Sequence, residues 1–267
     1  MQAKKSLGQH FLTSEKALTQ IVAAGDIHVG DLIVEIGPGK GVLTERLLAR
    51  ADKVIAIEKD RELIPLLQET FRDAVTQGRL EVVERDILKF DPETVRFYNK
   101  PYKVIANIPY YITGAIIEQF LSTTRQPERM VLLMQREVAE RIVARDGKQS
   151  ILSIAVAAYG TPRIIDRVPR GAFNPPPSVE SAILSIDSIH RAFFTDCDEH
   201  LFFAVLKSIF GKKRKQIGKS FGEYLDDKSI AHTILARAGI DPTTRPEDIA
   251  LNTWKLLVQK IQESGVQ

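Results

Sequence analysis

The sequence has only one cysteine among its 267 residues, so it can form neither an internal disulfide nor a cysteine-based metal cluster. Cys197 stands between Asp196 and Asp198, and two neighbouring carboxylates raise the pKa of a thiol, the opposite of what activates a nucleophile. The five histidines are scattered, with no His-x-x-x-His or His-x-His pair, so we expect no metal site.

Long apolar runs are also missing. No stretch approaches the roughly 20 apolar residues that a membrane-spanning helix needs. The basic start at residues 1–5 is not followed by the apolar core of a secretory signal. A net charge of +3 is too small to predict a nucleic-acid partner by itself. We therefore expect a cytoplasmic protein with no membrane partner.

What the sequence does contain, between about 30 and 135, is short apolar runs that alternate with helical patterns. This alternation predicts a parallel, doubly wound α/β sheet. Apolar–polar alternation at 163–168 and 182–187 predicts a final antiparallel pair at the sheet edge, which makes seven strands. The expected parallel strands are 32–36, 53–58, 80–84, 102–106 and 129–134, and the expected helices are 42–50, 60–71 with Asp60 as N-cap, 113–122, 136–145 and 150–159.

The pattern changes near residue 190, where β-alternation stops and apolar residues take helical spacing. This change predicts two domains, an α/β domain over residues 1–188 and a small all-α domain over residues 189–267. A proline-rich stretch, 173–177, lies between the last two predicted strands and suits only an extended loop.

Three glycines follow the first predicted strand, at Gly37, Gly39 and Gly41. They let the chain turn tightly and let a ligand lie on the backbone. A nicotinamide-binding fold has the spacing Gly-x-Gly-x-x-Gly instead, and here Val42 occupies the place of its third glycine. Glu35, two residues before the first glycine, suits a cationic ligand better than a pyrophosphate. S-adenosylmethionine is such a ligand, because it carries an ammonium and a sulfonium.

Acidic residues follow the next two strands. Glu58 ends the second strand, where a carboxylate can accept hydrogen bonds from both ribose hydroxyls of a nucleoside. Asp86 follows the third strand and can accept from an adenine amine. Each acid alone is equally well a solvated charge. Together with the glycines they predict a class I (Rossmann-like) methyltransferase.

The fourth predicted strand is followed by Asn107, Ile108, Pro109 and Tyr110, the most specific signal in the chain. The amine at N6 of adenine is a weak nucleophile, because its lone pair is delocalised into the ring. Two acceptors, the Asn107 side-chain oxygen and the Ile108 carbonyl, can hold its hydrogens out of the ring plane. Pro109 restricts Ile108 to an extended conformation and so fixes that carbonyl. Tyr110 offers a stacking face, worth about 1–3 kcal/mol.

An adenine that enters such a pocket must leave its own stack, so we expect a second aromatic surface. Phe173 is the candidate, since the prolines after it stiffen its loop. The alternative is that Phe173 anchors the loop in the core.

A basic block lies in the helical tail, and no acid interrupts it. Such a block favours phosphate binding with a steep salt dependence, so it predicts contact with RNA, although a solvated helix face is the alternative. The predicted RNA-binding residues are Lys207, Lys212, Lys213, Arg214, Lys215 and Lys219.

With these residues assembled, the chain resembles, nearly from end to end, the KsgA (RsmA) family of bacterial small-subunit ribosomal RNA adenine dimethyltransferases. Two blocks are specific to that family and its near relatives, which include the Erm methyltransferases. They are residues 5–12, Lys-Ser-Leu-Gly-Gln-His-Phe-Leu, and residues 173–181, with the pattern Phe-x-Pro-x-Pro-x-Val-x-Ser.

The resemblance implies dimethylation of N6 on two adjacent adenines near the 3′ end of 16S rRNA, within an immature 30S subunit. It also implies S-adenosylmethionine as cofactor, and we expect a monomer. An Erm-like enzyme acting on 23S rRNA and a non-catalytic ribosome assembly factor are the alternatives. The cofactor contacts carried over from the family are His10, Leu12, Gly37, Glu58, Asp86 and Asn107.

Overall fold

The protein folds into two compact units, one formed by residues 1–140 and 160–189 and the other by residues 141–159 and 190–267. The structure, a computed structural model, describes residues 9–94, 100–212 and 215–265. The division differs from the predicted domain boundary at 188/189, because residues 141–159 group with the C-terminal helices.

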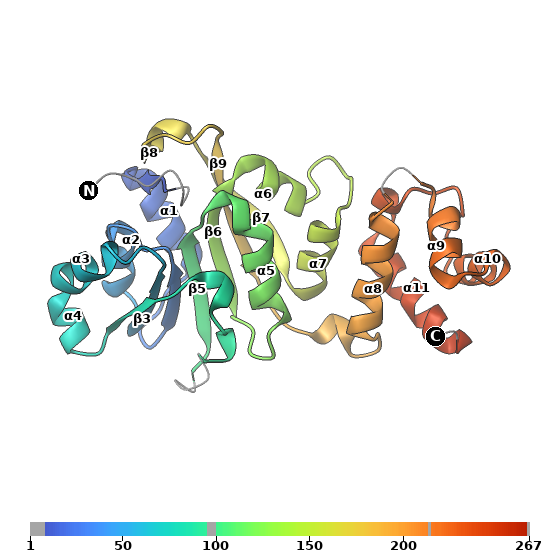
Figure 1. Ribbon diagram of the computed structural model, residues 1–267, viewed down its shortest axis with the longest axis horizontal. Helices are drawn as coiled ribbons and strands as arrows, with labels where there is room; N and C mark the ends of the chain where they lie inside the picture. Colours follow the sequence, from blue (N-terminus) through green and yellow to red (C-terminus); the bar gives the residue numbers. More distant parts are fainter. Residues whose placement is uncertain (1–8, 95–99, 213–214, 266–267) are drawn as a thin grey trace. The chain divides into compact units, whose positions relative to one another are not determined.

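The first unit is built on a seven-stranded sheet with the order β4-β3-β2-β5-β6-β9-β7 (Figure 1). The first five strands in that order run parallel, while β9 pairs antiparallel with both β6 and β7. The predicted mostly parallel sheet with an antiparallel pair at its edge is confirmed. The strands are β2 (Leu32–Ile36), β3 (Lys53–Glu58), β4 (Leu80–Glu84), β5 (Tyr102–Asn107), β6 (Arg129–Gln135), β7 (Thr161–Val168) and β9 (Ser181–Asp187).

The middle strands are buried on both faces, as their largely apolar sequences predict. Every residue of β2 is buried, and β2 lies between β3 and β5. Its register pairs Ile36 with Ile57 on one side and Val34 with Val104 on the other. Parallel pairing in this register brings the carboxyl ends of β2, β3 and β5 to one edge of the sheet.

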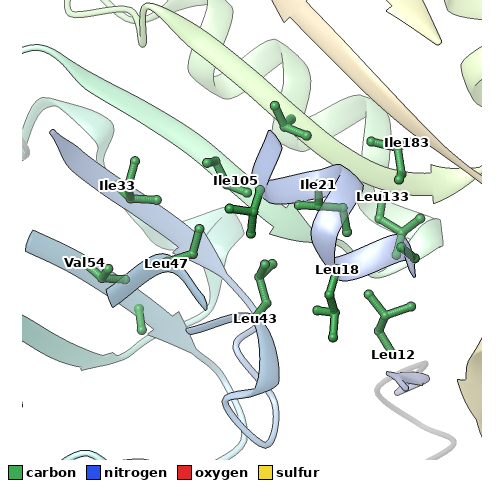
Figure 2. Close-up of a cluster of buried hydrophobic side chains, with 14 of the residues drawn as sticks. Leu12, Leu18, Ile21, Ile33, Leu43, Leu47, Val54, Ile105, Leu133 and Ile183 are labelled. Carbon is green, nitrogen blue, oxygen red and sulfur yellow. The ribbon is translucent and has the colours of Figure 1, made fainter. Parts of the chain in front are cut away.

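One face of this sheet is covered by α1 (Glu15–Gly25) and α2 (Val42–Leu48). Ser14 caps α1 by accepting a hydrogen bond from the Ala17 N–H at 3.3 Å. Figure 2 shows Leu18 and Ile21 of α1 among the side chains of a buried cluster that also includes Ile105 of β5. This packing holds the start of α2 close to the glycine turn that follows β2.

The opposite face carries α5 (Thr113–Ser122), whose Phe120 contacts Tyr102 of β5 at a ring-centroid distance of 6.5 Å. The helix predicted at 60–71 begins later than expected, at Leu63, because Asp60 does not cap it; the Asp60 carboxylate accepts instead from the Glu62 N–H in a turn. The remaining helices of this region are α3 (Leu63–Thr70), α4 (Arg72–Thr76) and α6 (Arg136–Ile142).

A small two-stranded sheet joins two segments that are far apart in the sequence. β1 (Phe11–Leu12) pairs antiparallel with β8 (Phe173–Asn174), and the register sets Leu12 opposite Phe173. Thr13 extends the pairing, since its N–H and its hydroxyl both donate to the Ala172 carbonyl, at 2.8 and 3.0 Å. Strands of two residues carry no periodic signal, so neither strand was predicted.

The second unit is helical, as predicted, and has its own core around Trp254 and Phe202. Ile154 and Ala158 of α7 belong to this core, which explains why residues 141–159 group here. Among the described residues no helix is long and apolar enough to span a membrane. The helices are α7 (Ile151–Tyr159), α8 (Glu199–Phe210), α9 (Ile217–Leu225), α10 (Lys228–Arg237) and α11 (Leu251–Ser264).

Candidate active site

A pocket opens at the carboxyl ends of β2, β3 and β5, the edge where ligands bind in open parallel sheets. Its empty volume, counted out to open solvent, is about 1210 Å³. The predicted residues that line it are His10, Leu12, Glu35, Gly37, Gly39, Glu58, Asp86, Asn107, Ile108, Pro109 and Tyr110.

Gly41 was predicted to contact a cofactor, but it is buried and does not line the pocket. It precedes α2 with a φ of 84°, in the left-handed region that favours glycine. A Cβ at this position would lie 2.4 Å from the ring of Phe71. The structure therefore gives Gly41 a packing role, in which it admits the Phe71 ring against the start of α2.

Phe173 was predicted to offer a stacking face to the target base, and the structure corrects this. Its side chain is only 4% exposed, belongs to the core cluster that includes Leu12, and does not line the pocket. Pairing of β8 with β1 turns the ring inward, because Leu12 and Phe173 stand opposite each other and are both buried. Phe173 is the loop anchor that the alternative interpretation described.

Glu35 places a carboxyl group at the floor of the pocket. Glu35 is 1% exposed, and the hydroxyl of Thr44 donates to its Oε2 at 2.7 Å. Burial raises the pKa of Glu35 to about 8, against the lowering effect of the Thr44 hydrogen bond and with a further increase from the charge of Glu58. Because only the Thr44 hydrogen bond offsets the effect of burial, the Glu35 carboxyl is well suited to pair with a cationic ligand group.

Glu58, at the end of β3, lies beside the glycine turn. One carboxylate oxygen accepts from the Gly39 N–H at 3.2 Å and the other from the Asp60 N–H at 2.8 Å. Burial raises the pKa of Glu58, and these backbone hydrogen bonds lower it. The two contacts fix the plane of the carboxylate. Each oxygen keeps a second lone pair, as a ligand with two hydroxyls requires.

Asp86 follows β4 and is fixed from two sides. Oδ1 accepts from the Leu88 N–H at 3.1 Å, and Oδ2 pairs with the Lys59 ammonium at 2.9 Å. The hydrogen bond from Lys59 is the main reason that the pKa of Asp86 is lowered, so the carboxylate stays ionised. Lys59 also lines the pocket, and the sequence analysis did not identify it.

The segment of residues 9–12 crosses the pocket and is attached at several points. Gln9 donates to Asp60 at 3.0 Å. Nδ1 of His10 lies 2.9 Å from the carbonyl oxygen of Pro175, which can only accept, so Nδ1 carries the proton. The ammonium of Lys40 lies 4.8 Å from the centroid of the Phe11 ring. The segment therefore forms one wall of the pocket.

Asn107 ends β5 and is half-buried. Its Nδ2 donates to the backbone carbonyl of His10 at 3.1 Å. Because a carbonyl only accepts, this contact assigns the amide nitrogen to that side and leaves Oδ1 as the acceptor end of the group. The predicted acceptor role of Asn107 agrees with this orientation. The contact with His10 was not foreseen.

Tyr110 is held by a residue that the sequence analysis did not single out. Its hydroxyl lies 2.5 Å from Oγ of Ser181, the fully buried first residue of β9. Burial raises the pKa of Tyr110, so the phenol remains neutral. The signal was present, because Ser181 ends the Phe-x-Pro-x-Pro-x-Val-x-Ser block. Its partner was not visible, since 71 residues separate the two side chains.

In the helical unit, the predicted RNA-binding block divides over two helices. Lys207 belongs to α8 and Lys219 to α9, while Lys213 and Arg214 lie outside the described residues. Lys212 and Lys215 both form ion pairs with Glu223 of α9. No acid interrupts the block in the sequence, but folding brings one to it.

The family model described as "Ribosomal RNA adenine dimethylase" matches residues 1–263. The chain is 42% identical over 258 residues to the ribosomal RNA small subunit methyltransferase A of Dehalococcoides mccartyi strain BAV1, covering 96% of this chain and 88% of that protein. It is 37% identical over 264 residues to the protein of the same name from Alkaliphilus oremlandii, covering 96% of this chain and 91% of that one.

Solved structures agree with the fold. A dimethyladenosine transferase from Plasmodium falciparum superposes with a TM-score of 0.81 at 26% identity, covering 96% of this chain and 99% of that one. The 23S rRNA methyltransferase ErmE superposes with a TM-score of 0.74 at 23% identity, covering 94% of this chain and 99% of that one. The second likeness concerns the fold alone. These structural neighbours are Rossmann-like methyltransferases, as predicted for this chain.

Proposed function

This chain belongs to the ribosomal RNA adenine dimethylase family, and we propose that it dimethylates N6 of two adjacent adenines near the 3′ end of 16S rRNA, with S-adenosylmethionine as the methyl donor. Support for the small subunit comes from the relatives at 37–42% identity, which are named small-subunit methyltransferases. The single observation that carries the mechanism is the orientation of the Asn107 amide at the pocket.

The cofactor site proposed here uses the residues around the glycine turn. Glu35 pairs with the ammonium of S-adenosylmethionine, Glu58 accepts from the ribose hydroxyls, and Asp86 accepts from the adenine amine. Gly37 suits close approach of the cofactor to the backbone. A Cβ at this position would meet only the Asn107 carbonyl, at 3.8 Å, so the ligand side of the turn is open. His10 and Leu12 line the same pocket and complete the wall.

Catalysis then rests on positioning and electrostatics. When bound, S-adenosylmethionine supplies a methyl group on a positively charged sulfur. For the first methyl group, the Asn107 Oδ1 and the Ile108 carbonyl would accept the two hydrogens of the target amine, and for the second, one of them would accept the hydrogen that remains. These contacts would localise the lone pair of the amine toward the methyl carbon. Each transfer would form a carbon–nitrogen bond at the expense of a carbon–sulfur bond, and the methylated amine would then release one proton to water. No side chain has to act as a strong base, since the methylated ammonium is acidic.

Tyr110 is the proposed stacking surface for the target base, because its ring lines the pocket beside Asn107 and its hydroxyl is anchored away from it. Pro109 has φ −60° and ψ 129°, an extended conformation that carries the chain from the strand to the Tyr110 turn. A neutral phenol suits stacking on a neutral base, and the raised pKa of Tyr110 keeps the phenol neutral.

The basic residues Lys207, Lys212, Lys215 and Lys219 are the proposed phosphate contacts on the helical unit, together with Lys213 and Arg214. They would add sequence-independent affinity for the rRNA of an immature 30S subunit. We further propose that the enzyme acts as a monomer in the cytoplasm.

Substrate choice tests the proposal against its rivals. Undermethylated 30S and 50S subunits are each incubated with the protein and radiolabelled S-adenosylmethionine, and labelled adenines are mapped. We expect label on two adjacent adenines of 16S rRNA. Label on 23S rRNA would favour the Erm-like alternative, which the fold of ErmE permits. Binding to 30S subunits without any transfer would favour a non-catalytic assembly factor.

A further inference from the structure

The ring of Tyr110 is fixed at two places by parts of the chain that are distant in sequence. Its hydroxyl lies 2.5 Å from Oγ of Ser181, whose residue has no exposed surface. The His10 ring lies nearly parallel to it, with centroids 6.2 Å apart and an interplanar angle of 23°. Ser181 is itself immobilised, because β9 pairs it with Gln135 of β6 and with Val168 of β7.

Both contacts are organised by one segment, residues 173–181. Its first residue, Phe173, is buried in the core, and its last, Ser181, contacts Tyr110. Between them, the Pro175 carbonyl accepts from the His10 ring at 2.9 Å, and the Pro177 carbonyl accepts from the Arg170 guanidinium at 2.8 Å. The segment is thus attached to the protein along its length, and its polar contacts reach the two rings at the pocket.

We propose that residues 173–181 act as a frame for the substrate side of the pocket, and that Ser181 is a positioning residue that locks the Tyr110 ring for the target adenine. This inference rests on the proposed function. It assigns the segment a role different from base stacking by Phe173, which the burial of that ring rules out in this structure.

A fixed orientation of the Tyr110 ring matters because stacking and methyl transfer both depend on where the target base lies. The base must lie flat on Tyr110 while its amine reaches the acceptors at Asn107 and Ile108. A tyrosine anchored through its hydroxyl does not have to be ordered when the base arrives, so less binding free energy is lost. When such a supporting contact is removed, the pocket remains, but its side chains are no longer held in the geometry that the reaction requires.

The test is a double-mutant cycle with Ser181→Ala and Tyr110→Phe, which remove the same hydrogen bond from opposite sides. Ser185→Ala is the matched control, because Ser185 is equally buried on β9 but its hydroxyl bonds to Asp187 at 2.8 Å. The readouts are kcat for methyl transfer to 30S subunits, the Kd for S-adenosylhomocysteine, and the melting temperature.

We expect each single variant to lower kcat about three- to tenfold, the range of one neutral hydrogen bond. The double variant should be no slower than either single variant, and Ser185→Ala should match the wild type. The Kd for S-adenosylhomocysteine should stay unchanged in Ser181→Ala, because Ser181 does not line the pocket. If Ser181→Ala does not fold, Tyr110→Phe still reports the loss of the contact, since its ring is only partly buried.

Single-variant rates within twofold of the wild type, or losses that multiply in the double variant, would overturn the role of Ser181. A wild-type protein that transfers no methyl group to 30S subunits would instead overturn the proposed function.

Discussion

Replacing Glu35 with Gln should stabilise the ligand-free protein, and increasingly so as the pH rises. Burial raises the pKa of Glu35 from an ordinary value of 4.5 to about 8. Between these values the unfolded chain has lost its proton while the folded protein still holds it, so stability falls as the pH increases. Gln has the same shape, can accept the Thr44 hydrogen bond and never ionises.

The size of the effect follows from the two pKa values. Each unit between them corresponds to about 1.4 kcal/mol. The raised pKa of Glu35 therefore lowers the free energy of unfolding by about 3 kcal/mol at pH 7 and by about 5 kcal/mol above pH 8, as upper limits, because water can enter an open pocket. For a domain of this size 1 kcal/mol shifts the melting temperature by about 2–4 °C. The variant should gain about 10 °C over the wild type at pH 8.5 and only about 2 °C at pH 5.

The assay is thermal unfolding of both proteins, free of ligand, at several pH values from 5 to 8.5. The difference between the two melting temperatures is the quantity of interest, because groups that do not interact with Glu35, such as Asp86, titrate in both proteins and cancel. A difference that stays constant over this range would refute the argument that Glu35 is protonated in the folded protein.

Three further results are expected. S-adenosylhomocysteine should bind up to about tenfold more tightly for each pH unit from 6 to 7.5, because Glu35 must release its proton to pair with an ammonium; calorimetry on Glu35→Gln should show a weaker affinity with no such slope. Gly41→Ala should lower the free energy of unfolding in urea by more than the control Gly78→Ala. Both glycines have a positive φ, 84° and 72°, but only at Gly41 would a Cβ collide with Phe71. Equal losses of unfolding free energy in the two variants would contradict that collision. Glu223→Gln should tighten binding to 30S subunits and steepen the salt dependence of that binding. Hydrogen bonds from Lys212 and Lys215 hold the pKa of Glu223 at about 2, so its carboxylate stays charged and pairs with both lysines. Glu263→Gln is the control, and unchanged binding of Glu223→Gln would show that these lysines do not contact the RNA.

The sheet could be predicted because its strands carry strong local patterns. Residues 32–36 and 53–58 are apolar runs of strand length, and the structure has strands with those bounds. The pocket could also be predicted in outline, since parallel strands deliver their carboxyl ends to one edge. Knowing that Glu35, Glu58, Asp86 and Asn107 each stand at or beside a strand end was therefore enough to group them.

Contacts between distant segments could not be predicted. β1 and β8 are two residues long and pair only because the fold brings them together. That pairing buries Phe173. From the sequence alone, Phe173 was expected to be accessible to the target base, because it begins a proline-rich loop. The same limit applies to Glu223, which folding places against Lys212 and Lys215, and to Gly41, whose neighbour Phe71 follows 30 residues later.

The division into two units differs from the predicted domain boundary for a related reason. α7 is almost entirely apolar, so its sequence says that it is buried but not against which partner. In the structure Ile154 and Ala158 pack in the helical core. Cys197 shows the same pattern on a smaller scale: the flanking acids do raise its pKa, but burial is the larger cause, and together they bring the pKa to about 11.

The acceptor role of Asn107 is tested most directly by the rate of a single methyl transfer. Asn107→Ala and Asn107→Asp are compared with the wild type on undermethylated 30S subunits, with saturating radiolabelled S-adenosylmethionine. Removing one preorganised polar contact to a reacting group costs about 100- to 1,000-fold in kcat, and both variants should fall in that range. Asp should not rescue, because it cannot donate to the His10 carbonyl as Nδ2 does. A rate for Asn107→Ala within tenfold of the wild type would contradict the mechanism.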